Sequence, residues 1–214
     1  MGASASGQLP RLYPILDEGL LELRGVALGR VAEDLMAAGA QLVQYRNKVG
    51  EPESVLRFAA VLWEVFAGTG CRLILNDRAD LAVLAGFGGV HVGQGDLPPE
   101  DARRVVGVER WVGVSTHKDE QVRVADATSA DYIAVGPVFA TGTKVDAEPV
   151  IGLEGVRRAR ALTKKPVVGI GGITRANARS VIEAGADSVA VISGLFVEGE
   201  TVEKVARDFL EILR

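Results

Sequence analysis

The sequence contains a single cysteine, Cys71, among 214 residues. One thiol cannot form a disulfide within the chain or build a cysteine metal cluster. We expect Cys71 to be a small residue of the core. The sequence also lacks any run of about 18 consecutive apolar residues, which argues against a membrane span. The first ten residues, MGASASGQLP, lack the charged and then apolar regions of a secretory signal. We therefore predict a cytoplasmic protein whose residues 1–10 are disordered or loosely attached.

An excess of positive charge is also lacking, because the formal net charge is −4. Nucleic-acid binding depends on a basic surface, so nucleic acid is not an expected partner. Any anion must then be held by a local site, and we predict small-molecule substrates. No Pro/Ser-rich linker or low-complexity tract divides the chain, and its 48% hydrophobic content supports one sizeable core. We expect a single domain over residues 11–214. The sequence is compatible with a homo-oligomer but does not specify one.

Short β-rich runs alternate with segments of helical periodicity along the chain. The eight runs are Leu12–Leu16, Gln41–Tyr45, Arg72–Leu75, Gly89–Val92, Trp111–Val114, Tyr132–Val135, Pro166–Ile170 and Ser188–Ile192. Segments 31–39, 53–68, 151–165 and 174–185 have apolar residues three and four apart, as helices do. This alternation predicts a parallel sheet, and eight units predict an α/β fold of the closed (β/α)8 TIM-barrel type. A doubly wound open sheet is the alternative, and both folds bind ligands at the carboxyl ends of strands.

Polar residues collect where the predicted strands end. Seven strand ends carry such groups: residues 44–48, 76–77, 93–96, 115–117, 141–144, 171–172 and 193–194. In a barrel these loops surround one mouth, so we predict a single functional site there.

The charged residues of these loops indicate a diphosphate and a metal ion. Arg46, Lys48 and Lys144 bring three cations to the mouth of an acidic protein, which suits a polyanion. Asp77 and Asp96 have no His or Cys close by in the sequence. Two such carboxylates, completed by water and phosphate oxygens, are typical of Mg²⁺ sites. We therefore predict Mg²⁺ as the cofactor.

A second anion site is predicted further round the mouth. Gly171-Gly172 precedes a helix expected to begin at Thr174, and Ser193-Gly194 follows the last strand. Barrels often bind phosphate with the loops after strands seven and eight, where backbone N–H groups approach the anion closely. The turn 141–144 (Thr-Gly-Thr-Lys) lies between the two predicted sites. Its hydroxyls could then serve one ligand and its ammonium the other.

Each of these features also has an ordinary structural explanation. The pair Asn76-Asp77 could cap the next helix, and the glycine pair could be only a tight turn. Arg46 and Lys48 could be solvated surface charges. All these explanations would have to hold together at one end of the barrel.

The two histidines are interpreted differently. His91 alternates with Val90 and Val92, which favours a packed or hydrogen-bonded strand residue over a base. His117 follows Ser115-Thr116 at a strand end, where a catalytic acid or base is the alternative.

Several sequence blocks together resemble the thiamine-phosphate synthase family. They are VQYRNK (43–48), LNDRADLA (75–82), GVHVGQGDLP (89–98), GVSTH (113–117), DYIAVGPVFATGTK (131–144), VVGIGGIT (167–174) and GADSVAVISG (185–194). These blocks cover nearly the whole chain after residue 10, and they occur in the same order as in the family. The glycine-pair phosphate loop alone is shared by many barrels, whereas the full series is specific.

The resemblance implies a role for individual residues. The pyrimidine diphosphate would be bound by Gln44, Tyr45, Arg46, Asn47, Lys48, Asn76, Ser115 and Lys144. A thiazole phosphate would be bound by Thr141, Gly142, Thr143, Gly172, Ile192 and Ser193. Asp77 and Asp96 would hold Mg²⁺. The residues themselves indicate a polyanion, a metal and a second phosphate, and only the resemblance supplies the pyrimidine and the thiazole.

The reaction implied by the resemblance joins 4-amino-2-methyl-5-(diphosphooxymethyl)pyrimidine to a (carboxy)thiazole ethyl phosphate and releases diphosphate. Arg46, Lys48 and Lys144 would stabilise the departing diphosphate. Ser115 would donate or accept a hydrogen bond without becoming a nucleophile, since no base is evident beside it in the sequence.

The sequence departs from many relatives at three positions and leaves two other functions open. Tyr45 and Asn47 stand where relatives often carry Leu and an acidic residue, and Val145 where they often carry Pro. These departures put the pyrimidine contact in doubt but not the diphosphate contact. A thiazole tautomerase of the same fold, with His117 as its base, is one alternative. A non-catalytic sensor of a phosphorylated metabolite is the other.

Overall fold

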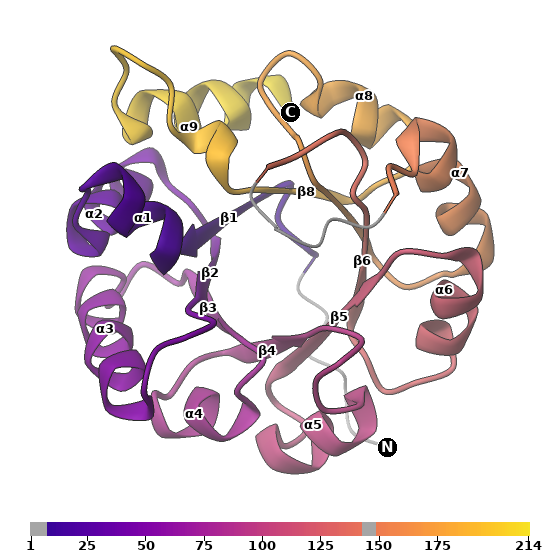
Figure 1. Ribbon diagram of the computed structural model, residues 1–214, viewed down its shortest axis with the longest axis horizontal. Helices are drawn as coiled ribbons and strands as arrows, with labels where there is room; N and C mark the ends of the chain where they lie inside the picture. The colour runs from indigo at the N-terminus through magenta and orange to yellow at the C-terminus, as the bar shows by residue number, and fades with distance from the viewer. Residues whose placement is uncertain (1–7, 143–148) are drawn as a thin grey trace.

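Eight parallel strands close into a barrel in the order of the sequence. A computed structural model describes residues 8–142 and 149–214 (Figure 1). The strands are β1 (Leu12–Asp17), β2 (Leu42–Arg46), β3 (Arg72–Asn76), β4 (Gly89–Val92), β5 (Trp111–Thr116), β6 (Tyr132–Val135), β7 (Val167–Ile170) and β8 (Ser188–Val191). β1 pairs with β8, where Tyr13 lies opposite Ala190, and this pairing closes the ring. The predicted TIM barrel is confirmed, and each predicted strand matches an observed one to within two residues at either end.

Helices follow the strands and form a ring around the barrel (Figure 1). They are α1 (Glu18–Arg24), α2 (Leu28–Ala38), α3 (Pro52–Val65), α4 (Ala79–Leu84), α5 (Pro99–Val106), α6 (Asp119–Asp126), α7 (Gly152–Leu162), α8 (Ala178–Glu183), the 3₁₀ turn η1 (Ser193–Leu195) and α9 (Val202–Ile212). α8 begins four residues later than the predicted start at Thr174. The reason is a turn in which the Thr174 N–H donates to the Asn177 Oδ1 at 2.8 Å.

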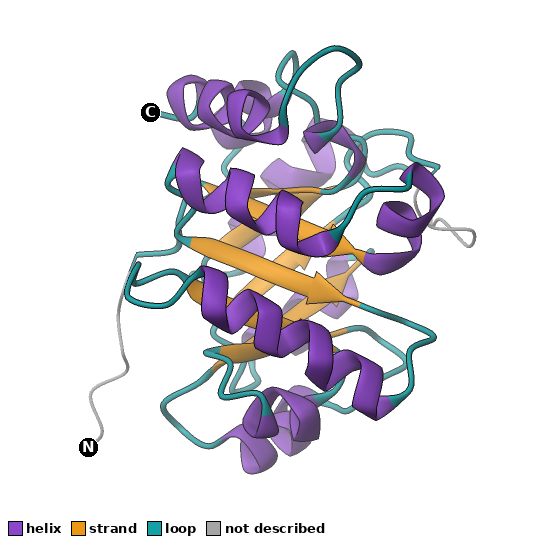
Figure 2. Ribbon diagram, turned by 90° about the vertical axis from the view of Figure 1, so that its left-hand side faces the viewer, coloured by secondary structure: helices purple, strands orange, loops and turns teal. Residues whose placement is uncertain are grey.

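Both faces of the strands are buried. The barrel wall therefore divides the buried apolar side chains into an inner cluster inside the barrel and an outer cluster between the strands and the helices. Alternate residues of each strand point into the barrel or out toward the helices. Figure 2 shows the strands from the side, with helices packed around them. On β2, for example, Leu42 belongs to the inner cluster, whereas Val43 and Tyr45 belong to the outer one. This period of two decides which side chains can reach a ligand at the mouth.

The interior of the barrel is filled rather than hollow at its amino end. Leu9, which precedes β1, is 6% exposed and packs in the inner cluster with Leu42, Ile74 and Trp111. Cys71 is partly buried against the outer cluster. Across the described ranges 8–142 and 149–214, no helix has both the length and the apolarity needed to cross a bilayer.

Candidate active site

A pocket opens at the carboxyl ends of the strands, inside the barrel. Side chains from all eight strands, and one from the residue after β8, line it: Tyr13, Ile15, Gln44, Arg46, Asn76, His91, Ser115, Ala134, Val168, Ile170, Ala190 and Ile192. The set includes five residues predicted from the sequence to be part of the site. Asn76 is 8% exposed, and its Nδ2 has no hydrogen-bond partner among the described residues. A buried donor without a partner is costly, so this amide indicates where a ligand acceptor would lie.

Two ion pairs sit at the rim of this pocket. The Arg46 guanidinium donates a hydrogen bond to Asp17 at the end of β1. The Lys48 ammonium donates to Asp77, and its Nζ lies 3.9 Å from the Oδ2 of Asp96. Both predicted cations are therefore in place, and each is held by a carboxylate from a neighbouring strand end.

Asp77 has an unusual backbone conformation. Its φ is +62°, in the left-handed region that non-glycine residues rarely adopt, and its N–H donates to the carbonyl of His91 at 2.7 Å. Strained backbone of this kind is concentrated at functional sites. The helix α4 begins after Arg78 without a side-chain cap, so the interpretation of Asn76-Asp77 as a helix cap is not supported.

The two carboxylates Asp77 and Asp96 lie close enough to influence each other. Burial raises the pKa of Asp77, and the neighbouring Asp96 adds to this, while the Lys48 hydrogen bond opposes it. For Asp96, burial is outweighed by hydrogen bonds from Asp77 and from the Gly93 N–H at 2.9 Å, which leave its pKa lowered. Asp77 therefore resists ionisation whereas Asp96 does not, and a hard cation between the two carboxylates would stabilise the charge of both. No cluster of three or more His, Cys, Asp or Glu ligands occurs in the part of the chain that the structure describes.

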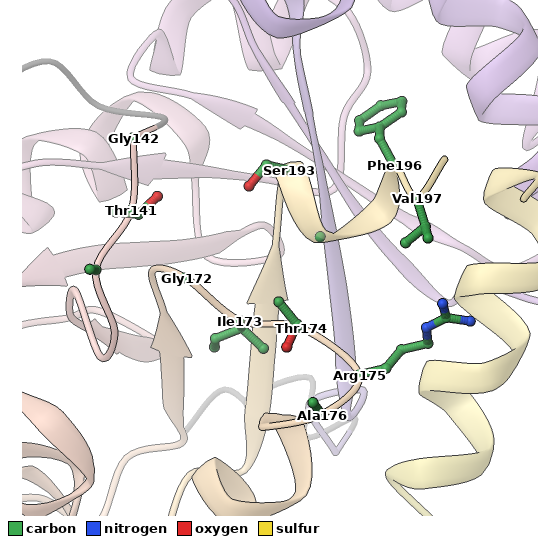
Figure 3. A pocket seen from close by; sticks show the side chains of 12 residues that line it. Thr141, Gly142, Gly172, Ile173, Thr174, Arg175, Ala176, Ser193, Phe196 and Val197 are labelled. Atoms are coloured by element: carbon green, nitrogen blue, oxygen red, sulfur yellow. The ribbon is translucent and has the colours of Figure 1, made fainter. Parts of the chain in front are cut away.

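Figure 3 shows a second pocket, of about 540 Å³. Its lining residue Ser193 follows Ile192, which lines the first pocket. The second pocket is bounded by the loop after β6, by the turn after β7 and by η1. Thr141 and Ser193 flank its opening, and Arg175 extends away from it toward α9, where it pairs with Glu200 and Asp208. Gly172 has a φ of +63°, and a Cβ there would lie 2.4 Å from the Ala140 carbonyl oxygen. Only glycine at position 172 lets the turn after β7 approach the loop after β6 so closely.

Comparisons with known proteins agree with this arrangement. The family model described as "Thiamine monophosphate synthase" matches residues 12–195. The chain belongs to this family. The thiamine-phosphate synthase of Koribacter versatilis is 52% identical over 212 residues, which are 98% of this chain and 99% of that protein. The thiamine-phosphate synthase of Chloroflexus aurantiacus is 43% identical over 197 residues, which are 92% of this chain and 89% of that protein.

A solved structure also resembles the chain closely. The thiamine phosphate pyrophosphorylase from Pyrococcus furiosus superposes with a TM-score of 0.81 at 32% identity, and 95% of each chain is covered. The family and the fold predicted from the sequence are therefore confirmed.

The structure brings most of the residues implied by the family resemblance to the two pockets. Gln44, Arg46, Asn76, Ser115 and Ile192 line the inner pocket. Thr141, Gly142, Gly172 and Ser193 line the outer one. Thr143 and Lys144, together with the departure at Val145, lie outside the described residues.

Tyr45 and Asn47 are not brought into either pocket. The Tyr45 ring is fully buried in the outer cluster, against Phe58. The Asn47 Nδ2 donates to the Tyr45 hydroxyl at 3.2 Å, and its Oδ1 accepts from the Gly50 N–H at 2.7 Å. These two departures from the thiamine monophosphate synthase pattern therefore stabilise the loop after β2, and their side chains do not alter the ligand pocket.

Four residues of the site were not singled out as functional from the sequence: Asp17, Tyr13, Tyr132 and His91. The Nε2 of His91 lies 2.8 Å from the Ser115 Oγ, although the two residues are 24 positions apart. The sequence did not show that an imidazole lies beside Ser115, because the pairing of the neighbouring strands β4 and β5 is not visible as sequence proximity. The interpretation of His91 as a hydrogen-bonded strand residue is confirmed.

His117 lies apart from both pockets of this family site. Its Nδ1 is 2.6 Å from the Gly136 carbonyl oxygen, and its N–H donates to the Gln121 Oε1 at 2.7 Å. The side chain lines a small crevice against α6 and α7. This placement does not favour the tautomerase alternative, which needs His117 at the mouth.

Proposed function

We propose that the protein is a thiamine-phosphate synthase, a transferase that moves a pyrimidinylmethyl group from diphosphate to the nitrogen of a thiazole. The proposal is carried by the presence of two pockets at the carboxyl ends of the barrel strands in a chain similar to thiamine-phosphate synthases along almost all its length. One pocket suits the pyrimidine diphosphate and the other the thiazole phosphate. The reaction joins the two ligands, so both must be bound side by side.

The pyrimidine diphosphate would bind with its ring in the inner pocket. The buried Asn76 amide and the Ser115 hydroxyl supply polar contacts for the ring. Arg46 and Lys48 at the rim face the diphosphate, and Lys144 is predicted to join them. Fixed cations aimed at a leaving group lower the free energy of the transition state, because charge develops on that group. The ion pair with Asp17 holds the Arg46 guanidinium in position before the ligand arrives.

Asp77 and Asp96 would hold Mg²⁺. When bound, Mg²⁺ would neutralise negative charge on the diphosphate oxygens. The Lys48 ammonium contacts Asp77 and lies 3.9 Å from the Oδ2 of Asp96, so it would be within reach of the same oxygens. The three side chains thus form one unit for binding a metal diphosphate.

The thiazole phosphate would bind in the outer pocket. Its phosphate would lie against Gly172 and Ser193, where the glycine leaves the backbone N–H accessible. Thr141 lines this outer pocket, three positions before Lys144 in the sequence. This placement would hold the thiazole nitrogen over the pyrimidine methylene carbon, which removes most of the entropic cost of bringing the two together.

The bond changes follow from the substrates. The amino group of the pyrimidine donates electrons into the ring, the methylene C–O bond breaks, and diphosphate leaves with the electron pair. The thiazole nitrogen then gives its lone pair to the methylene cation and forms the new C–N bond. With a carboxylated thiazole, CO₂ is lost as well. The protein supplies charge stabilisation and alignment rather than a nucleophile, which agrees with the cations at the rim.

The test is product formation by purified protein given both substrates, with Mg²⁺ and with EDTA, followed by chromatography of thiamine phosphate and diphosphate. Metal-dependent appearance of both products is expected. Isomerisation of a carboxythiazole phosphate without coupling would instead show a tautomerase. Ligand binding without chemistry would show a sensor. A cytoplasmic location stays a prediction from the sequence.

A further inference from the structure

Five polar side chains form a continuous line of hydrogen bonds through the inside of the barrel. The Gln44 Nε2 donates to the Tyr13 hydroxyl at 2.8 Å, and the Tyr13 and Tyr132 hydroxyls are 2.8 Å apart. The Tyr132 hydroxyl lies 3.1 Å from the His91 Nδ1, and the His91 Nε2 lies 2.8 Å from the Ser115 Oγ. The first four side chains are at most 6% exposed, so their hydrogen bonds are largely shielded from bulk water.

The proton positions along this line follow from counting donors and acceptors. An amide nitrogen only donates, so the Tyr13 oxygen accepts from Gln44 and its single proton must go to Tyr132. Tyr132 then donates its own proton to the His91 Nδ1. A neutral imidazole that accepts at Nδ1 carries its proton on Nε2, which therefore donates to the Ser115 Oγ. The Ser115 proton is left to point away from His91.

The opposite direction leaves a buried donor without an acceptor. If Ser115 donated to His91, then His91 would donate to Tyr132 and Tyr132 to Tyr13. The Tyr13 oxygen would receive two donors, and its own proton would have no acceptor among the described residues. A charged imidazole produces the same conflict, because its Nδ1 also carries a proton. Buried donors without partners are rare in folded proteins because they are costly.

The packing of the barrel makes room for this line. A Cβ on Gly113 would lie 2.1 Å from the Tyr132 Cζ, so a glycine on β5 is required for the ring to occupy the interior. The rings of His91 and Tyr132 stack with centroids 5.6 Å apart. Burial raises the pKa of both Tyr13 and Tyr132, so both phenols keep their protons.

We propose that Tyr13, Tyr132 and His91 are positioning residues that transmit the orientation of the Gln44 amide to Ser115 and hold the Ser115 hydroxyl as a hydrogen-bond donor toward the inner pocket. The role in turnover rests on the proposed function, in which the pocket holds the pyrimidine diphosphate. Ser115 then donates to an acceptor on that ligand, either a ring nitrogen or the departing ester oxygen. The hydrogen-bond direction itself does not depend on which ligand binds.

The direction can be measured on the full-length protein without any ligand. The chain has two histidines, so a long-range ¹H–¹⁵N spectrum of ¹⁵N-histidine-labelled protein contains two imidazole patterns, and His117→Gln assigns them. We expect His91 to be neutral with its proton on Nε2. A proton on Nδ1, or on both nitrogens, would overturn the proposal whether or not the protein is a synthase.

The contribution to turnover is tested by a double-mutant cycle. Tyr132→Phe removes one hydroxyl and is expected to lower kcat about 10-fold, the loss typical of one functional hydrogen bond. In a Ser115→Ala background the same change should alter kcat by less than about twofold, because Tyr132 acts through Ser115.

The matched control is Thr116→Val, which removes another buried hydroxyl of β5. That hydroxyl donates to the Ala134 carbonyl at 3.0 Å and lies outside the line. Its effect on kcat should be small and the same in both backgrounds. Equal losses from Tyr132→Phe in the two backgrounds would overturn the proposal. A wild-type protein that makes no thiamine phosphate would contradict the proposed function instead, and the spectrum would still decide the hydrogen-bond direction.

Discussion

The Lys48 ammonium donates a hydrogen bond to the Asp77 carboxylate across the mouth of the barrel. The cation comes from the loop after β2 and the carboxylate from the end of β3, where its backbone φ is +62°. In the proposed reaction Lys48 binds diphosphate, and Asp77 binds the metal that accompanies it. Their pairing keeps both groups in the mouth before the substrates arrive.

Asp77→Asn is expected to weaken the binding of Mg²⁺ at the site directly. The substitution keeps the size and removes the charge, so the Mg²⁺ concentration for half-maximal activity should rise at least about 10-fold and kcat/KM should fall about 100-fold. Titrating Mg²⁺ in the product assay measures both.

Asp80→Asn is the matched control for Asp77→Asn. Asp80 is an exposed carboxylate three residues further along, and it is paired with Arg78 at 2.6 Å. Its Mg²⁺ titration should resemble that of the wild-type protein. Identical Mg²⁺ curves for Asp77→Asn and the wild type would remove Asp77 from the metal site.

Asp17→Asn separates two roles of one carboxylate. Oδ1 of Asp17 caps α1 by accepting from the Leu20 N–H at 3.0 Å, and the same side chain holds Arg46. Asparagine is also a good helix cap, so stability should change little, whereas kcat should fall about 10-fold because the guanidinium loses its orientation. Asp17→Ala should in addition lose about 1 kcal/mol of unfolding free energy. Chemical denaturation and kinetics of both variants measure this, and an unchanged kcat in Asp17→Asn would show that Arg46 needs no positioning.

Gly172→Ala is expected to be more destabilising than Gly25→Ala. Both glycines have a φ of +63°, so both substitutions incur the same backbone strain, about 1 kcal/mol. A Cβ at residue 25 meets nothing within 4 Å, whereas one at residue 172 would lie 2.4 Å from the Ala140 oxygen. The difference in unfolding free energy between the two variants measures the close approach of the loops. Equal losses would mean that the loop after β6 can move aside at no cost.

The thiol of Cys71 should be nearly inert in the folded protein. Burial raises its pKa from 9.0 to about 12, so the reactive thiolate is on the order of 10³ times rarer at pH 8 than for an ordinary thiol. The rate of alkylation by iodoacetamide should therefore be low in buffer and rise sharply in denaturant. Since the folded-state pKa is raised, the alkylation rate of the native protein should keep rising about tenfold per pH unit beyond pH 9 and level off only near pH 12. Rapid alkylation of native protein at pH 8 would contradict the buried placement.

The fold and the rim of the site could be predicted from the sequence because both depend on local patterns. β-rich runs, helical periodicity and polar strand ends are visible along the chain, and they place Arg46, Lys48, Asp77 and Asp96 at the mouth. The start of α8 was predicted four residues early because the turn made by Asn177 resembles a helix in its periodicity.

The interior of the site could not be predicted in the same way, since it depends on which strands are neighbours. The contact between His91 and Ser115 needs the register of β4 against β5, which no local pattern states. Tyr45 was assigned to the ligand from its place in a motif, yet the period of two turns its side chain outward between Gln44 and Arg46. Counting alternate residues along β2 would have found this.

The central claim is that two separate pockets at the mouth bind the two substrates, and the most direct test compares KM values of two variants for both substrates. Lys48→Ala should raise KM for the pyrimidine diphosphate about 10-fold or more and leave KM for the thiazole phosphate nearly unchanged. Gly172→Ala should show the reverse pattern. If both variants raise KM for the same substrate, or neither variant discriminates between the two, the division of the mouth into a diphosphate pocket and a phosphate pocket is contradicted.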